Sequence, residues 1–223
     1  MIRLIVRFPL FSSLLAVLTF SIAVEFAFWA IHGRQMKSDL VDGTSFPIAE
    51  GPDDFGSVGD FGFVERSGKS VTQDTLRGKV WIAACFFTCC TDSCPKLSAA
   101  MTRLQGELGT EPAVRLVSIT VDPTRDTTET LSRYAKAYNA DADRWLFLTG
   151  SEEAVRRFVR ERLKLAAEPN TAPDTTDGSR VLHSPKLTLI DKHGHINGYF
   201  DGTDPVAVGR LKLAAERLAG EAP

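Results

Sequence analysis

The sequence predicts an α/β domain with a mixed sheet, because segments with strand and helix patterns alternate beyond residue 57. Val80–Phe87 is continuously apolar, which is typical of a strand buried on both faces. Val114–Val121 predicts a second buried strand. Between them, from Pro95 to Leu108, apolar residues recur at the spacing of one helical face.

The other elements can be placed in order around this centre. Before it, Phe61 and Phe63 alternate with glycines and Ser67-Gly68-Lys69 turns toward Val71, which predicts a β-hairpin. After it we expect a helix with the capping box Asp126-Thr127-Thr128-Glu129 that runs to Tyr138, and then a strand over Trp145–Leu148. A helix capped by Ser151 and an exposed loop over 167–180 should follow. The domain should end with a hairpin of Leu187–Ile190 with Ile196–Phe200 and a last helix begun by Asp204-Pro205.

The N-terminus carries a long apolar segment over residues 8–31. At about 1.5 Å per residue this segment can span a hydrocarbon core of about 30 Å, which favours a membrane anchor behind a cytoplasmic stretch over 1–7. The small residues Ser21-Ile22-Ala23 leave a cleaved signal segment as the alternative. We expect a linker over 32–57 and a globular domain over 58–223, exported to the periplasm or an equivalent extracytoplasmic space.

The composition of the chain excludes some classes of function. The net charge is −2 and no basic run stands out, so nucleic acid is not expected as a partner. Four cysteines are too few for a disulfide scaffold. Three of them, Cys89, Cys90 and Cys94, lie within six residues of each other, which indicates a site.

Cys90 and Cys94 lie where the apolar strand gives way to a helix. If the helix begins near Asp92, Cys94 is in its first turn and Cys90 directly precedes it. Free N–H groups and the helix dipole stabilise thiolates there. Such a pair can bind a soft metal such as copper or exchange disulfides. A dithiol at this junction is the thioredoxin-like arrangement, so we expect that mixed sheet with flanking helices.

His183 is the candidate third ligand. It follows the 167–180 loop and precedes the strand that starts at Pro185, where a thioredoxin-like chain passes the dithiol. Cys90, Cys94 and His183 would form a Cys₂His set, which suits copper and by ligand type also allows Zn²⁺.

Other reactive side chains are expected to be structural. Cys85 is predicted to be a core thiol. Cys89 is expected to point away as a buried strand-end residue, with an additional ligand or resolving thiol as the alternative. His193 and His195 are expected to be exposed in a hairpin turn. The Asp122–Thr127 turn is expected to end a strand and cap a helix rather than form a partner surface.

Together these motifs make the chain similar to the Sco/SenC family of membrane-anchored, copper-binding assembly proteins. The family pattern joins an aromatic strand and a Thr to Cys-Pro-Asp-x-Cys-Pro, a Val-Asp-Pro-x-Arg-Asp-Thr turn, a Leu-Thr-Gly and a distant Asp-His-Ser. The chain supplies Phe87, Thr88, Cys90, Asp92, Cys94, Pro95, Val121–Thr127, Leu148–Gly150 and His183-Ser184. It departs at Thr91, where the family has Pro, and at Leu182, where it has Asp.

The resemblance implies a thioredoxin-like fold and copper, as Cu(I) or Cu(II), held by Cys90, Cys94 and His183. It further implies a membrane-anchored metallochaperone that serves the copper centre of cytochrome c oxidase. The partner would be the apo copper-centre subunit or another copper protein. The alternative is a thiol–disulfide oxidoreductase whose Cys90 and Cys94 cycle as a redox pair and keep a partner's copper-ligand cysteines reduced. A peroxidase or sensor is a third hypothesis.

Overall fold

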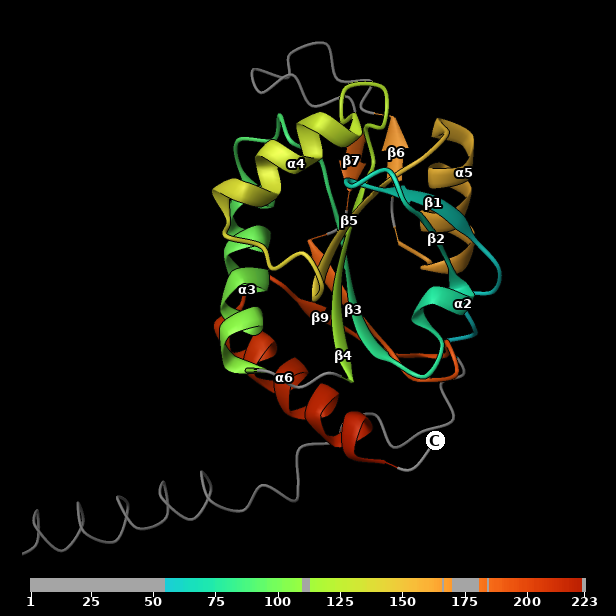
Figure 1. The fold of residues 1–223 in the computed structure, drawn as a ribbon. Coiled ribbons are helices and arrows are strands. Elements are labelled where there is room, and N and C mark those ends of the chain that lie inside the picture. Colours follow the sequence, from blue (N-terminus) through green and yellow to red (C-terminus); the bar gives the residue numbers. More distant parts are fainter. Residues whose placement is uncertain (1–54, 110–112, 166, 170–180, 184, 222–223) are drawn as a thin grey trace, which may run out of the picture. The chain divides into compact units, whose positions relative to one another are not determined.

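A seven-stranded mixed sheet and a separate strand pair organise the chain. The computed structural model describes residues 55–109, 113–165, 167–169, 181–183 and 185–221. The strands are β1 (Gly62–Glu65), β2 (Ser70–Thr72), β3 (Val80–Phe86), β4 (Val114–Thr120), β5 (Trp145–Thr149), β6 (Ala167–Pro169), β7 (Val181–His183), β8 (Lys186–Ile190) and β9 (Ile196–Asp201). The large sheet has the order β2-β1-β5-β4-β3-β8-β9, and β6 pairs with β7 (Figure 1).

Strand β3 lies inside the sheet and leads into the cysteine segment. It pairs parallel with β4 from Val80 opposite Val114 to Phe86 opposite Thr120, and antiparallel with β8. All seven of its residues are buried, which confirms the strand expected from its apolar run. Because β3 and β4 are parallel and in register, their carboxyl ends meet at one edge of the sheet.

The mixed character of the sheet is confirmed by its outer strands. The pairs β3–β4 and β4–β5 are parallel. The pairs β1–β2, β1–β5, β3–β8 and β8–β9 are antiparallel. The α/β core therefore has three central parallel strands with antiparallel strands on both sides.

Helices cover both faces of the sheet. They are α2 (Gln73–Leu76), α3 (Ser93–Glu107), α4 (Thr128–Ala137), α5 (Glu152–Arg157), its π-helical continuation η1 (Phe158–Arg162), and α6 (Pro205–Gly220). Figure 1 shows α3, α4 and α6 on one side of the sheet and α2 and α5 on the other. The alternation of β3 agrees with this: Phe86 contacts Tyr134 of α4, with 5.1 Å between ring centroids, and Trp81 faces Phe61 at 6.1 Å.

The caps of the helices follow the sequence with one correction. Ser151 and Asp204 cap α5 and α6 as predicted, accepting from the backbone N–H groups of Ala154 and Val206. Helix α4 is capped by Thr127 instead of Asp126. The carboxylate of Asp126 is turned inward and bonded elsewhere, so it is not available as a cap.

The strand pair β6–β7 corrects the expected loop over 167–180. Ala167 lies opposite His183, and Pro169 opposite Val181. The prediction is therefore wrong for 167–169, and 170–180 lie outside the described residues. The polar, proline-containing composition favoured a loop, but strand formation here depends on a distant partner segment that local composition does not reveal.

The expected anchor over 8–31 lies outside the described residues, as does most of the expected linker. Phe55, near the linker's end, packs edge-on against Tyr199 with ring centroids 5.3 Å apart. Ser57 forms an antiparallel bridge with His195. In the described part of the chain, no helix has the length and apolar character needed to cross a membrane.

Candidate metal and redox site

The segment from Phe87 to Cys94 joins the buried end of β3 to α3. The carbonyl of Phe87 accepts the backbone N–H of Cys90 over 3.3 Å, which closes a tight turn. Helix α3 begins at Ser93, with Asp92 as its N-cap residue. Cys90 therefore precedes the helix and Cys94 lies in its first turn, as the sequence predicted.

The structure brings the two thiols together at this helix start. The backbone N–H of Cys94 lies 3.4 Å from the Sγ atom of Cys90, within hydrogen-bonding reach of sulfur. The hydroxyl of Ser93 lies 3.9 Å from the same sulfur. Cys90 is half-buried and Cys94 is fully buried, and all four cysteines are free thiols. One thiol of the pair is thus reachable from solvent, and the other is covered.

The surroundings shift the pKa values of the two thiols in opposite directions, down for Cys90 and up for Cys94. Partial burial opposes ionisation of Cys90, but hydrogen bonds from the backbone of Cys94 and Asp92 and from neighbouring side chains outweigh it and lower its pKa. Burial raises the pKa of Cys94 far above its ordinary value, and the adjacent Cys90 adds to that shift. At neutral pH, Cys90 is therefore the more readily ionised thiol of the pair, and Cys94 is the one that favours its protonated form.

A buried carboxylate is hydrogen-bonded to the segment before Cys90. Asp126, 1% exposed, accepts the backbone N–H of Thr88 over 3.1 Å and the hydroxyl of Thr120 over 2.5 Å, both at Oδ2. Its Oδ1 accepts the hydroxyl of Thr88. Burial raises the pKa of Asp126, the hydrogen bonds from Thr120 and Thr88 oppose that rise, and nearby Asp122 adds to it.

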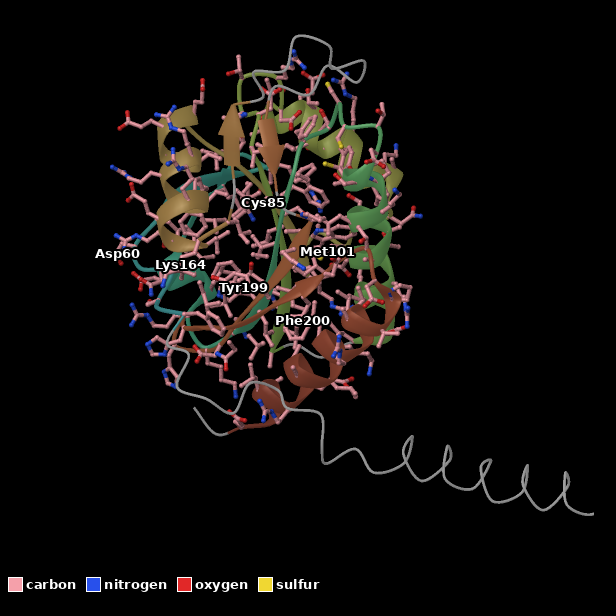
Figure 2. All side chains as sticks on the ribbon, turned by 180° about the vertical axis from the view of Figure 1, so that it is seen from behind. Asp60, Cys85, Met101, Lys164, Tyr199 and Phe200 are labelled. Atoms are coloured by element: carbon pink, nitrogen blue, oxygen red, sulfur yellow. The ribbon has the colours of Figure 1, made fainter. Side chains whose placement is uncertain are left out.

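The other predicted side chains are mostly where the sequence placed them. Cys85 is buried inside β3 (Figure 2), and burial raises its pKa to about 12. His193 and His195 are exposed in the turn between β8 and β9. The expectation of a buried Cys89 is wrong: its side chain is exposed, because the chain has left the sheet before this residue and turns through solvent.

His183 is the last residue of β7, and the structure describes its backbone. Figure 1 shows β7 at the end of the large sheet where β3 ends and α3 begins. The imidazole itself lies outside the described residues. Among the described side chains, no cluster of three histidine, cysteine or acidic residues forms a metal site. The structure thus brings Cys90 and Cys94 together, and His183 as a ligand stays a prediction.

Sequence reasoning missed the contact between Asp126 and Thr88. It assigned Asp126 to a helix cap and Thr88 only to a motif. A signal was available, because two parallel strands end next to each other and the polar residues that follow them meet at one edge. Asp126 is six residues beyond Thr120, however, so the inward turn of its side chain cannot be inferred from position alone.

Comparison with known proteins agrees with this geometry. The family model SCO1/SenC matches residues 50–216. A curated relative, the SCO1 protein homolog of Bacillus subtilis, is 32% identical over 65% of this chain and 73% of its own length. Across the first four curated relatives, the chain spans between 53% and 73% of their lengths.

Two solved structures share the fold. BsSco, described as a member of the Sco family of cytochrome c oxidase assembly proteins with a disulfide switch, is 28% identical with a TM-score of 0.62, over 74% of this chain and 95% of its own. ScoI of Arabidopsis thaliana with copper bound is 25% identical with a TM-score of 0.58, over 71% and 95%. The fold is therefore the thioredoxin-like one expected, and the chain belongs to the SCO1/SenC family.

Proposed function

We propose that this protein is a copper-binding metallochaperone whose cargo is held by Cys90, Cys94 and His183. The observation that carries the proposal is the convergence of Cys90 and Cys94 at the start of α3, with the backbone N–H of Cys94 3.4 Å from the sulfur of Cys90. Family membership gives this dithiol its context, since a related ScoI has been solved with copper bound.

The chemistry of the donor set supports copper. Thiolates are soft ligands and suit Cu(I), and an imidazole also suits Cu(II). Cys90 is half-buried in a segment open to solvent, which favours exchange of a cargo ion with a partner over permanent retention. The end of β7, where His183 lies, is at the same end of the sheet as the start of α3 (Figure 1), which supports His183 as the proposed third ligand.

The proposed partner is the apo copper-centre subunit of cytochrome c oxidase or another copper protein. The proposal rests on the relative BsSco, which is described as a member of the Sco family of cytochrome c oxidase assembly proteins. In the proposed organisation, residues 1–7 are cytoplasmic, 8–31 anchor the chain in the membrane, 32–57 form a linker and 58–223 form the copper-binding domain. That domain would face the periplasm or an equivalent space.

Copper stoichiometry tests the proposal. The reduced full-length chain, purified in detergent without oxygen, is loaded with copper and treated with a competing chelator. We expect about one copper per chain in the wild type and its loss in Cys90→Ala, Cys94→Ala and His183→Ala. His195→Ala and Cys89→Ser are the matched controls, as an exposed imidazole and an exposed thiol that should not matter. Full retention in all three ligand variants would refute the proposal.

A second candidate function is thiol–disulfide exchange, favoured by the unequal thiols. An accessible Cys90 with a lowered pKa and a buried Cys94 with a raised pKa form an attacking and a resolving pair. Incubation with an oxidised copper-centre subunit distinguishes the roles. A reductase would reduce that disulfide in the absence of copper, with oxidation of its own Cys90–Cys94 pair, and His183→Ala would still do so. A pure metallochaperone would leave the disulfide oxidised in both cases.

A further inference from the structure

One buried side chain fastens the Cys90 segment to the neighbouring loop. Two of the three donors to the Asp126 carboxylate, the backbone N–H and the hydroxyl, belong to Thr88, two residues before Cys90. The third is the hydroxyl of Thr120, the last residue of β4. A carboxylate that is 1% exposed carries a desolvation cost that only well-placed donors offset, so this contact is specific.

We propose that Asp126 is a positioning residue for the dithiol: it holds the segment Thr88–Asp92 so that the sulfur of Cys90 stays at the start of α3. The proposal rests on the proposed function insofar as copper is the ligand of that dithiol. Asp126 does not itself touch the sulfurs and acts through Thr88.

The other hydrogen bonds described for this segment are local, formed within it or with the start of α3. Between Thr88 and Ser93 the side chains of Cys89, Thr91 and Asp92 are exposed, and the sequence contains no proline that would fix the backbone. Inside it, the backbone N–H of Cys90 donates to the carbonyl of Phe87, and the backbone N–H of Cys94 lies 3.4 Å from the sulfur of Cys90. The two hydrogen bonds from Thr88 to Asp126 connect this local arrangement to the loop that follows β4.

At the other end of the restraint, Asp126 is hydrogen-bonded into the turn that follows β4. The carbonyl of Asp122 accepts the backbone N–H of Asp126 over 3.0 Å, and the hydroxyl of Thr120 accepts that of Asp122 over 3.0 Å. The backbone N–H of Val121 donates to the carbonyl of Phe86 over 2.8 Å, which ties the ends of β4 and β3 together. Asp126 thus transmits the geometry of the sheet to the cysteine segment.

Shape, and not charge, is the proposed contribution, and this determines the variants. With asparagine at 126, the side-chain oxygen can take the place of Oδ2 and accept from the backbone N–H of Thr88 and the hydroxyl of Thr120. The side-chain NH₂ can take the place of Oδ1 and donate to the hydroxyl of Thr88, which then accepts a hydrogen bond instead of donating one. Asp126→Asn should therefore preserve the restraint. Asp126→Ala removes it, and Thr88→Val removes one of its hydrogen bonds. Ser118→Ala is the matched control. Ser118 lies in β4, as Thr120 does, and its hydroxyl accepts a buried 2.9 Å hydrogen bond from the indole N–H of Trp145 in β5, so the variant loses a buried hydrogen bond away from the cysteine segment.

Two measurements are made on the full-length chain in a Cys89→Ser background. The first is copper affinity by chelator competition, where we expect a loss of about tenfold or more in Asp126→Ala and a smaller loss in Thr88→Val. The second is the reduction potential of the Cys90–Cys94 pair in a glutathione buffer without copper. Loss of the hydrogen bond to the Cys90 sulfur disfavours the reduced form, so we expect a potential more negative by about 30 mV for each tenfold change in equilibrium.

The outcomes separate the two proposals. A wild type that fails to bind copper refutes the proposed function, while the potentials still decide the role of Asp126. Wild-type potentials in both Asp126→Ala and Thr88→Val, or an equal shift in Ser118→Ala, overturn the positioning role, as does an Asp126→Asn that behaves like Asp126→Ala. If Asp126→Ala does not fold, Thr88→Val against Ser118→Ala decides.

Discussion

The sharpest consequence of the site geometry is an order of reactivity among the thiols. A thiol with the ordinary pKa of 9.0 is about 1% ionised at pH 7, and Cys90 exceeds this because its pKa is lowered. Cys85, with a pKa of about 12, is about 0.001% ionised at the same pH. The thiolate fraction of Cys90 therefore exceeds that of Cys85 by about a thousandfold or more. Because Cys85 and Cys94 are also buried, we expect both to be alkylated still more slowly relative to Cys90.

The assay is iodoacetamide labelling of the reduced native chain in a Cys89→Ser background, with the modified positions located by fragment-ion mass spectrometry. We expect Cys90 to be labelled first, with a rate whose pH dependence is centred below 9.0. Cys94 and Cys85 should react only after urea unfolds the domain. Native Cys94 labelling as fast as that of Cys90 would refute the reasoning, because it would mean that the buried thiol is the accessible one.

Three further changes test the fold around the site. Gly202→Ala should lower the free energy of unfolding in urea by about 1–3 kcal/mol, because the added methyl would overlap Leu97, and unchanged stability would contradict this packing. The raised pKa of Cys85 means that its stabilising effect is complete below pH 9 and is lost as pH rises toward 12, at up to about 1.4 kcal/mol per pH unit, so Cys85→Ala should show a shallower alkaline decline in urea unfolding. Tyr134→Phe should cost about 1 kcal/mol in thermal unfolding by removing its 2.8 Å hydrogen bond with Ser98, with copper binding intact; equal loss of copper would place Tyr134 in the site.

The central fold could be predicted because burial leaves a strong signal. β3 is buried on both faces, so its sequence is apolar without alternation, and the parallel pairing with β4 follows from the helix between them. The dithiol at the start of α3 was visible for a related reason, since strand and helix patterns locate their junction within a residue or two.

The features that sequence reasoning missed depend on contacts between distant segments. The strand pair β6–β7 joins residues separated by the undescribed stretch 170–180, and nothing in Ala167–Pro169 marks it as a strand. The inward turn of Asp126 depends on Thr88, 38 residues earlier. Cys89 was expected to be a buried strand-end residue, but side-chain direction after the end of a strand is set by the turn and not by the strand's alternation.

The claim that Cys90, Cys94 and His183 hold copper together is tested most directly by X-ray absorption spectroscopy of the copper-loaded full-length chain, compared with His183→Ala. We expect two sulfur neighbours and one imidazole nitrogen in the wild type, with the imidazole signal absent from His183→Ala and retained in His195→Ala. A third sulfur in place of the imidazole, or an imidazole signal that survives in His183→Ala, would contradict the proposed ligand set.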